Sequence, residues 1–257
     1  MKKTVSEIIS SLYRGGYDGA RGFCLERIKS GRSTAVFTPN SEIIYRASRS
    51  RALCDLLCSA DLLFSDGIGS YIGMKLLKIP YAKRTAGIDL AERILNECAT
   101  YGYKVFLLGG KDGIAEIASK KLQSKYKGLT ICGTHHGYFE NNKDVINKIN
   151  SLGADVLFVC LGFPKQEEWI SRNLSRLPSV KLAIGLGGSL DVWSGNIKRA
   201  PSSLSNIGLE WLWRIYKDPK RLKRVGYLFN FSILLLKETV CKQKKFSKCY
   251  EIDNFSK

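Results

Sequence analysis

Six short apolar runs alternate with longer amphipathic segments between residues 34 and 190. The runs are TAVFT (34–38), DLLFS (61–65), YKVFLL (103–108), LTICGT (129–134), DVLFVC (155–160) and KLAIGL (181–186). They are rich in β-branched residues, leucine and phenylalanine and do not alternate cleanly with polar residues, which is typical of strands buried on both faces. The segments between them, such as IDLAERILNECATYG, have helical spacing. This order predicts an α/β fold, a Rossmann-like, mainly parallel sheet with helices on both faces.

The strand pattern ends near residue 190, and helical signals follow it. SSLSNIGLEWLWRIYK predicts one helix, and Asp218-Pro219 offers an N-cap and a first-turn proline for a second helix over residues 219–240. The polar tail over residues 242–257 is expected to be loose. We therefore expect a Rossmann-like catalytic domain over residues 1–195 and a basic helical appendage over residues 196–257.

The formal net charge of +18 favours a polyanionic partner, which is nucleic acid, an anionic membrane or a phosphate-bearing substrate. Residues 198–257 hold 14 Lys and Arg against 5 Asp and Glu, a net +9. Six of these cations gather around the start of the expected second helix: Arg214, Lys217, Lys220, Arg221, Lys223 and Arg224. Since Arg221 and Arg224 are three residues apart, they share one face of that helix. Its other face is expected to carry Leu222, Val225, Leu228, Phe229 and Ile233.

This basic helix has two interpretations. It is either an ordinary solvated helix with its apolar side on the core, or an amphipathic element that lies on a membrane surface. Aromatic residues suited to a membrane interface are close by: Trp211, Trp213, Tyr216, Tyr227 and Phe231. We favour the membrane interpretation, because each basic residue near an anionic leaflet contributes about 1 kcal/mol.

No segment reads as a signal peptide or a membrane-spanning helix. MKKTVSEIISSLYRGG lacks a long apolar region, and the apolar stretch Val225–Leu236 is too short to cross a bilayer. The eight cysteines include no CxxC pair, which favours buried thiols in a reducing compartment over disulfides or zinc. The chain is therefore expected to be cytoplasmic and peripheral on the inner face of the cell membrane.

Polar and glycine-rich loops follow all six predicted strands. They are Thr38-Pro39-Asn40, Asp66-Gly67-Ile68-Gly69, Gly109-Gly110-Lys111-Asp112-Gly113, His135-His136-Gly137-Tyr138, Gly162-Phe163-Pro164-Lys165-Gln166-Glu167 and Gly187-Gly188-Ser189-Leu190-Asp191. In open parallel sheets, ligands bind beyond the carboxyl ends of the strands. The sequence therefore predicts a substrate cleft at this edge.

Several of these loops contain residues that could bind phosphate or transfer a proton, and each of these residues also has a purely structural interpretation. In GGKDG the glycines either bring backbone N–H groups to a phosphate or form a tight turn from strand to helix. Asp66 either accepts a proton from a substrate hydroxyl or caps a helix. Thr38 and Asn40 are open to the same two interpretations, since Asn40-Ser41 can cap a helix that starts at Glu42.

The sequence gives little support for metal chemistry. His135 and His136 lack the spacing of a helical metal pair, so a structural role or a substrate contact is favoured over metal ligation. The predicted core has no Asp-x-Asp, the carboxylates with which Mg²⁺ usually holds a sugar diphosphate. We therefore expect no cofactor and no metal site. Glycine-loop N–H groups and cations such as Arg84 are expected to stabilise a departing diphosphate instead.

Eight motifs, taken in order, resemble the WecG/TagA/CpsF family of bacterial glycosyltransferases. They are TPNSEIIYRA, SDGIG, KRTAGIDL, LLGGKDG, HHGYF, VCLGFPKQEEWI, GLGGSLDVWSGNIKRAP and EWLWRIYKDPKR, and they cover about residues 34–224. The resemblance implies an inverting enzyme that transfers a sugar, often N-acetylmannosamine or its uronic acid, from UDP to polyprenyl-diphosphate-linked N-acetylglucosamine. It also implies a product for teichoic acid, enterobacterial common antigen or capsule, and a C-terminal segment that associates with the membrane.

The resemblance further implies roles for residues of this chain. Asp66 would be the general base and Thr38 its active-site neighbour. Asn40, Arg84 and Gln166 would contact substrate. The nucleotide UDP would be held by Gly109, Gly110, Gly187, Gly188 and Asp191. The appendage residues Arg214, Arg221 and Arg224 would close over the diphosphates.

Alternatives remain open at this point. The donor is expected to carry N-acetylmannosamine, but the same fold could take another UDP-sugar, such as the uronic acid or glucose. The charge alone also fits a nucleic-acid-binding protein, and the strand-GGxxG-helix pattern fits a nicotinamide-dependent oxidoreductase. We expect neither, and no nucleic acid as partner. A homo-oligomer that buries the apolar surface of the appendage is expected only away from the membrane.

Overall fold

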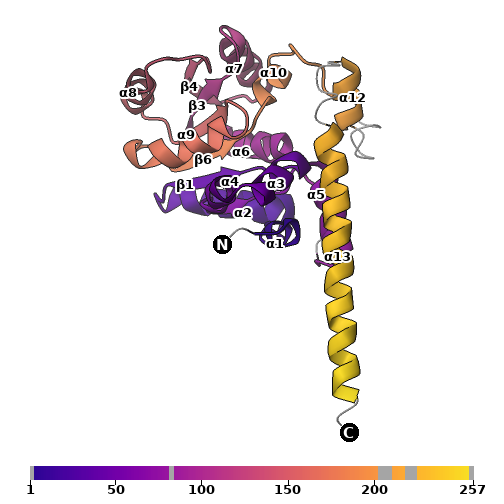
Figure 1. The fold of residues 1–257 in the computed structure, drawn as a ribbon. Helices are drawn as coiled ribbons and strands as arrows, with labels where there is room; N and C mark the ends of the chain where they lie inside the picture. Colours follow the sequence, from indigo (N-terminus) through magenta and orange to yellow (C-terminus); the bar gives the residue numbers. More distant parts are fainter. Residues whose placement is uncertain (1–2, 81–83, 202–209, 218–224, 255–257) are drawn as a thin grey trace.

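The computed structural model describes residues 3–80, 84–201, 210–217 and 225–254 (Figure 1). Its centre is a six-stranded sheet in the order β2-β1-β6-β5-β3-β4. The strands are β1 (Thr34–Phe37), β2 (Leu62–Leu63), β3 (Lys104–Gly109), β4 (Thr130–His135), β5 (Val156–Cys160) and β6 (Leu182–Gly185). All neighbouring strands pair in parallel. Each of the predicted runs therefore overlaps a strand, and the expected parallel sheet is confirmed.

Successive strand residues face opposite sides of the sheet, and helices cover both sides. Phe37 and Leu157 belong to one hydrophobic cluster, whereas their chain neighbours Val36 and Phe158 belong to the other. The first cluster is completed by α1 (Val5–Ser10), α3 (Ser41–Arg49), α4 (Arg51–Cys58), α5 (Gly67–Leu76), α8 (Asn142–Leu152), α9 (Lys165–Asn173) and α13 (Val225–Asn254). The second is completed by α2 (Gly16–Lys29), α6 (Gly87–Tyr101), α7 (Ile114–Lys125) and α10 (Ser189–Trp193). A short 3-10 helix, η1 (Leu174–Arg176), follows α9.

Helix α6 shows how the sequence sets this layering. Ile88, Ala91, Leu95 and Cys98 recur every three or four residues, which places them on one face of the helix. All four are buried in the second cluster. The apolar face therefore packs on the sheet and the polar face of α6 remains toward solvent.

The strand order predicts a ligand crevice at the carboxyl ends of β3 and β5. After β3 the chain continues to β4 at one edge of the sheet, whereas after β5 it continues to β6 in the opposite direction. Parallel sheets bind ligands beyond the carboxyl ends of strands where the connections diverge in this way. A ligand is therefore expected at the loops after β3 and β5.

The C-terminal helix α13 packs along the α/β body against α1, α3 and α5 and then continues beyond it (Figure 1). Phe231 and Leu235 are buried in this contact. The Glu238 carboxylate accepts hydrogen bonds from the backbone N–H groups of Val5 (3.2 Å) and Ser6 (2.7 Å) at the start of α1. Side-chain packing and hydrogen bonds thus attach the appendage to the body.

Two expectations for the appendage are wrong. Residues 242–254 continue helix α13 instead of forming a loose tail, because no glycine or proline interrupts the chain after Gly226. Phe231, expected among the aromatic residues at a membrane interface, is instead buried against the body with Leu235, whereas Phe229 and Ile233 are 66% and 38% exposed. Of the helix expected over residues 202–217, the structure describes α12 (Glu210–Lys217).

The described part of the chain contains no helix that is long and apolar enough to cross a membrane. The six cysteines whose side chains are described are free thiols. Burial raises the pKa of the thiols of Cys24, Cys98 and Cys160 to about 12. For these three residues, the expectation of buried thiols is confirmed.

Candidate active site

Asp66 lies between β2 and α5, but its carboxylate is bonded to a different helix. Asp66 Oδ1 accepts a hydrogen bond from the backbone N–H of Gly87 in the first turn of α6 (2.9 Å), and no side-chain bond caps α5. Backbone bonds hold the same junction, since Asp66 N–H donates to Pro39 O (3.1 Å) and Gly67 N–H donates to Thr85 O (2.9 Å). The carboxylate therefore lies where the loops after β1 and β2 meet the positive end of α6.

Thr38 is close to this junction and connects it to β6. The Thr38 side chain lies against Gly87, where an added Cβ would come within 2.9 Å of Thr38 Cβ. Thr38 is 8% exposed, and its hydroxyl donates to the carbonyl oxygen of Gly185 (2.7 Å). The structure thus brings Thr38 and Asp66 together around Gly87, as expected for active-site neighbours.

Asn40 caps helix α3. Asn40 Oδ1 accepts a hydrogen bond from the backbone N–H of Ile43 (3.1 Å), so the capping interpretation is confirmed. Capping uses the oxygen of the amide and leaves its two N–H donors for other contacts. A substrate contact through Asn40 Nδ2 therefore stays a prediction that is compatible with the cap.

Gln166 is buried in the first turn of α9 and braces the loop after β6. It is 2% exposed. Its Oε1 accepts a hydrogen bond from Gly187 N–H (2.8 Å), and its Nε2 donates to Glu167 Oε1 (2.9 Å). Both sides of the amide are thus bonded to protein groups. The direct substrate contact expected for Gln166 stays a prediction, and the geometry gives it a part in holding the loop.

The glycine turn after β3 lies where a side chain would collide with the backbone of β5. Gly109 has a φ of 134°, and an added Cβ would lie 2.4 Å from the carbonyl oxygen of Cys160 in β5. Gly137 N–H donates to Gly110 O (2.8 Å), so the loop after β4 is joined to the same turn. The tight-turn interpretation is therefore confirmed. It is compatible with a phosphate site, because α7 begins after Gly113 without a side-chain cap.

The loop after β6 lies beside this glycine turn. An added Cβ at Gly110 would lie 3.9 Å from Leu190 Cβ, which shows how close the two loops are. Asp191 Oδ1 accepts from Asn196 Nδ2 (2.9 Å), and Asp191 O accepts from Ile197 N–H (2.9 Å). The structure therefore brings the loops that contain Gly109, Gly110, Gly187, Gly188 and Asp191 together at the carboxyl edge of the sheet.

The expected cationic residues are placed only in part. Arg84 lies near the Tyr17 hydroxyl, which donates to Asp89 Oδ2 (3.1 Å) and accepts from Ala86 N–H (2.8 Å). Burial, and then the charge of Asp89, raise the pKa of Tyr17, whereas the charge of Arg84 lowers it slightly. Arg84 thus lies just before the N-terminus of α6, the end at which Asp66 bonds to Gly87. Of the three appendage arginines, Arg214 lies in α12 and its side chain is not described, and Arg221 and Arg224 lie outside the described residues.

The histidine pair orders the loop after β4. The rings of His135 and His136 are 4.7 Å apart between centroids, and His136 Nδ1 accepts from Tyr138 N–H (3.1 Å). In the part of the chain that the structure describes, no three His, Cys, Asp or Glu side chains are grouped to hold a metal ion. The loop-ordering interpretation is therefore the one that the contacts support.

Two residues of interest were not singled out from the sequence. Glu167 is 1% exposed, and its Oε2 has no hydrogen-bond partner among the described residues. Burial raises the pKa of its carboxyl group. Tyr138 is 74% exposed, and its neighbour Gly137 bonds to the glycine turn. The sequence places both residues near the carboxyl edge, but no sequence signal gives the burial of Glu167 or the exposure of Tyr138.

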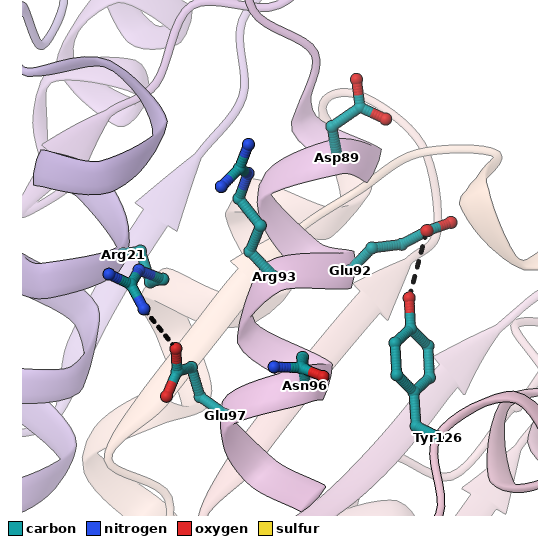
Figure 2. Close-up of a pocket in the computed structure, with 7 residues that line it drawn as sticks. All are labelled: Arg21, Asp89, Glu92, Arg93, Asn96, Glu97 and Tyr126. Atoms are coloured by element: carbon teal, nitrogen blue, oxygen red, sulfur yellow. Dashed lines mark hydrogen bonds and ion pairs between the residues drawn. The ribbon is translucent and has the colours of Figure 1, made fainter. Parts of the chain in front are cut away.

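A separate shallow cavity of about 410 Å³ lies on the outer side of α6 (Figure 2). It is lined by Arg21, Asp89, Glu92, Arg93, Asn96, Glu97 and Tyr126. Its charges are used within the protein: Arg21 pairs with Glu97 (2.5 Å), and Glu92 accepts from the Tyr126 hydroxyl (3.1 Å). The cavity contains none of the expected site residues, which the structure instead gathers at the carboxyl edge of the sheet.

The chain is an α/β protein whose polar and glycine-rich loops gather at the carboxyl ends of its parallel strands, the edge at which such sheets bind ligands. A model of the family described as "Glycosyl transferase WecG/TagA/CpsF family" matches residues 11–247. The chain therefore belongs to the WecG/TagA/CpsF family of glycosyl transferases. This membership supports the transferase expectation over a nucleic-acid-binding protein or a nicotinamide-dependent oxidoreductase.

Two relatives have the same name, N-acetylglucosaminyldiphosphoundecaprenol N-acetyl-beta-D-mannosaminyltransferase. The protein from Bacillus subtilis (strain 168) is 34% identical over 213 residues, which is 83% of this chain and 83% of the relative. The protein from Staphylococcus aureus (strain MRSA252) is 35% identical over 217 residues, 84% of each chain. The similarity thus spans most of both proteins.

Proposed function

We propose that this chain transfers N-acetylmannosamine from UDP to the N-acetylglucosamine of a polyprenyl-diphosphate-linked acceptor, with inversion at the anomeric carbon. The product would serve teichoic acid or a related surface polysaccharide. The names of the two relatives support the sugar and the acceptor. The observation that carries the proposal is the arrangement of one edge, where Asp66 and the glycine loops are joined through Thr38, Gly185 and Gln166.

UDP is proposed to bind in the crevice between β3 and β5. The diphosphate would lie against the Gly109-Gly110 turn and the uncapped N-terminus of α7, where backbone N–H groups and the helix dipole favour negative charge. Gly187, Gly188 and Asp191 form the opposite wall. The exposed ring of Tyr138 offers a stacking surface for the base.

Asp66 is proposed as the general base of a single displacement. It takes the proton of the acceptor hydroxyl, the acceptor oxygen forms a bond to the anomeric carbon, and the bond from that carbon to UDP breaks with its electron pair leaving on UDP. Base catalysis of this kind contributes about 10²–10⁴-fold to the rate. Arg84, with Arg214, Arg221 and Arg224, would stabilise the negative charge that develops on the diphosphates.

The appendage over residues 196–257 is proposed to hold the enzyme on the cytoplasmic face of the membrane, where a lipid-linked acceptor lies. Helix α13 carries an exposed apolar stripe in addition to its packed face. The stripe consists of Phe229, Ile233, Leu236 and Val240, which recur every three or four residues and are 66%, 38%, 51% and 50% exposed. Such a stripe, next to many cations, suits the surface of an anionic membrane. Away from a membrane the same stripe would favour self-association.

The test of the proposed function is UDP release by the purified chain. A panel of UDP-sugars, including N-acetylmannosamine, its uronic acid and glucose, is supplied with and without a lipid-diphosphate-linked N-acetylglucosamine, in EDTA. We expect release with UDP-N-acetylmannosamine that requires the acceptor and needs no divalent metal. Release of UDP with another donor alone would refute N-acetylmannosamine as the transferred sugar. Release only after Mg²⁺ is added would refute metal independence. No release with any donor, with Mg²⁺ and vesicles present, would refute the proposal.

A further inference from the structure

A buried carboxyl group lies directly behind the loop that follows β6. We propose that Glu167 is a positioning residue for the nucleotide site: its carboxylate fixes the orientation of the Gln166 amide, and that amide holds the backbone of Gly187. The hydrogen-bond part of this inference stands on the geometry alone. Its consequence for UDP rests on the proposed function.

The orientation of the Gln166 amide is determined from both sides. A side-chain amide has an oxygen that accepts and a nitrogen that donates. Gly187 N–H is a donor 2.8 Å from Gln166 Oε1, and Glu167 Oε1 accepts from Gln166 Nε2 at 2.9 Å. A flipped amide would put a donor against Gly187 N–H and an acceptor against the carboxylate. Glu167 therefore selects the orientation in which Gly187 is held.

The same amide also reaches the other half of the site. An added Cβ at Gly185 would lie 2.9 Å from Gln166 Nε2, so the amide packs directly on the end of β6. The carbonyl oxygen of Gly185 accepts the hydrogen bond from Thr38 (2.7 Å). A rotated Gln166 would therefore disturb Gly187 on one side and the partner of Thr38 on the other.

Fold stability does not account for the carboxyl group at this position. Glu167 is 1% exposed, and its Oε2 has no partner among the described residues. Burial raises the pKa of Glu167, the neighbouring charge of Glu168 raises it further, and hydrogen bonding to Gln166 and the charge of Arg46 lower it. A buried and half-satisfied carboxyl group disfavours the folded state, and an apolar side chain of similar volume is often neutral or stabilising. The group is thus better explained by the loop that it orders.

The variants separate positioning from packing. Glu167→Leu fills the space but offers no acceptor to Gln166. Glu167→Asp keeps a carboxylate but shortens the side chain by one methylene, which moves the carboxylate away from the Gln166 amide. This variant replaces Glu167→Leu in the test if the leucine variant does not fold. Glu167→Gln keeps an acceptor oxygen at the same distance. Glu168→Leu is the matched control, because it removes an adjacent carboxyl group that is 39% exposed and pairs with Arg172 (3.9 Å).

Two measurements are made on each variant: amide hydrogen exchange at Gly187 in the protein without ligand, and calorimetric binding of UDP. For Glu167→Leu and Glu167→Asp we expect faster exchange at Gly187 and about tenfold weaker UDP binding. Glu167→Gln and Glu168→Leu should match the wild type in both. Urea unfolding of Glu167→Leu should show no loss of stability.

Wild-type exchange at Gly187 in both Glu167→Leu and Glu167→Asp would overturn the positioning inference, whatever the ligand. Faster exchange in these variants together with unchanged UDP affinity would overturn its link to the nucleotide. If the wild-type protein binds no UDP but the exchange differences appear, the positioning of Gly187 is upheld and the proposed function fails instead.

Discussion

Replacing Gly109 with alanine tests how closely β3 and β5 must approach at the proposed nucleotide site. Gly109 has a φ of 134°, and the added Cβ would lie 2.4 Å from the oxygen and 2.6 Å from the carbon of the Cys160 carbonyl. Both atoms belong to the backbone, so no side-chain rotation relieves the contact and the strands must move apart. A φ of 134° lies far outside the left-handed helical region, and such sparsely populated conformations cost an alanine about 1–3 kcal/mol, while overpacking costs about 1–3 kcal/mol. We therefore expect the free energy of unfolding to fall by roughly 2–6 kcal/mol.

Gly102→Ala is the matched control, because Gly102 also has a positive φ (75°) but an added Cβ there meets nothing within 4 Å. Its loss should be limited to the backbone term of about 1–2 kcal/mol. With a slope of about 1–3 kcal/mol per molar urea, the unfolding midpoint of Gly109→Ala should fall by on the order of 1–2 M. UDP affinity should fall for Gly109→Ala and stay unchanged for Gly102→Ala. Equal midpoints and equal affinities for the two variants would refute the reasoning.

Four further predictions follow from the site and the appendage. Asp66→Asn keeps an oxygen for Gly87 N–H, so UDP binding should persist in calorimetry while transfer falls about 10²–10⁴-fold; near-normal turnover would exclude Asp66 as the base. Gly87→Ala places a Cβ 2.9 Å from Thr38 Cβ and should lower transfer on the order of 10²-fold by displacing the junction that holds Asp66, with little change in UDP affinity. The double variant Phe229→Glu and Ile233→Glu should bind anionic vesicles on the order of 100-fold more weakly in a sedimentation assay. Its thermal stability should not fall, since both side chains are exposed. Unchanged sedimentation would contradict the membrane role. Burial raises the folded-state pKa of Glu167 above its ordinary value of 4.5, so the folded state binds more protons than the unfolded state. The free energy of unfolding of the wild type should therefore fall relative to that of Glu167→Gln as the pH rises above 4.5. Urea unfolding at several pH values measures this difference.

The sheet could be predicted from the sequence because its strands are buried on both faces. Runs such as DVLFVC and KLAIGL contain too little polarity for any other position in a chain of this length. The order of the strands could not be predicted in the same way. It depends on which crossover helices pack on which face, and the apolar pattern of each helix is compatible with either face.

The appendage shows why a hydrophobic pattern can fail to select a face. Between Tyr227 and Leu236 all but two residues are apolar, so the helix has no clear polar side there. Contacts with α1, α3 and α5 bury Phe231 and Leu235, and they leave Phe229 and Ile233 exposed. Tertiary packing therefore decides a question that the local sequence leaves open.

The candidate site was predictable as an edge, but not as a set of contacts. Polar loops after parallel strands must lie at one edge of the sheet, so Asp66, Gly109 and Gly187 were expected to lie there together. The bond from Asp66 to Gly87 and the bond from Gln166 to Gly187 join segments about twenty residues apart. Their geometry depends on loop conformations that follow from the packed sheet, and no local motif encodes them.

The position of β6 explains how one edge can serve two substrates. β6 pairs with β1 on one side and with β5 on the other, so its carboxyl end lies between the Asp66 junction and the crevice beside β3. On the side of the Asp66 junction, the carbonyl oxygen of Gly185 accepts a hydrogen bond from the Thr38 hydroxyl. On the side of β3, the backbone N–H of Gly187 donates a hydrogen bond to Gln166 Oε1. A glycine at residue 185 is required there, because a Cβ would displace the Gln166 amide. The proposed acceptor and nucleotide sites are therefore set at a fixed separation by a single strand, which is what an in-line displacement between two bound substrates needs.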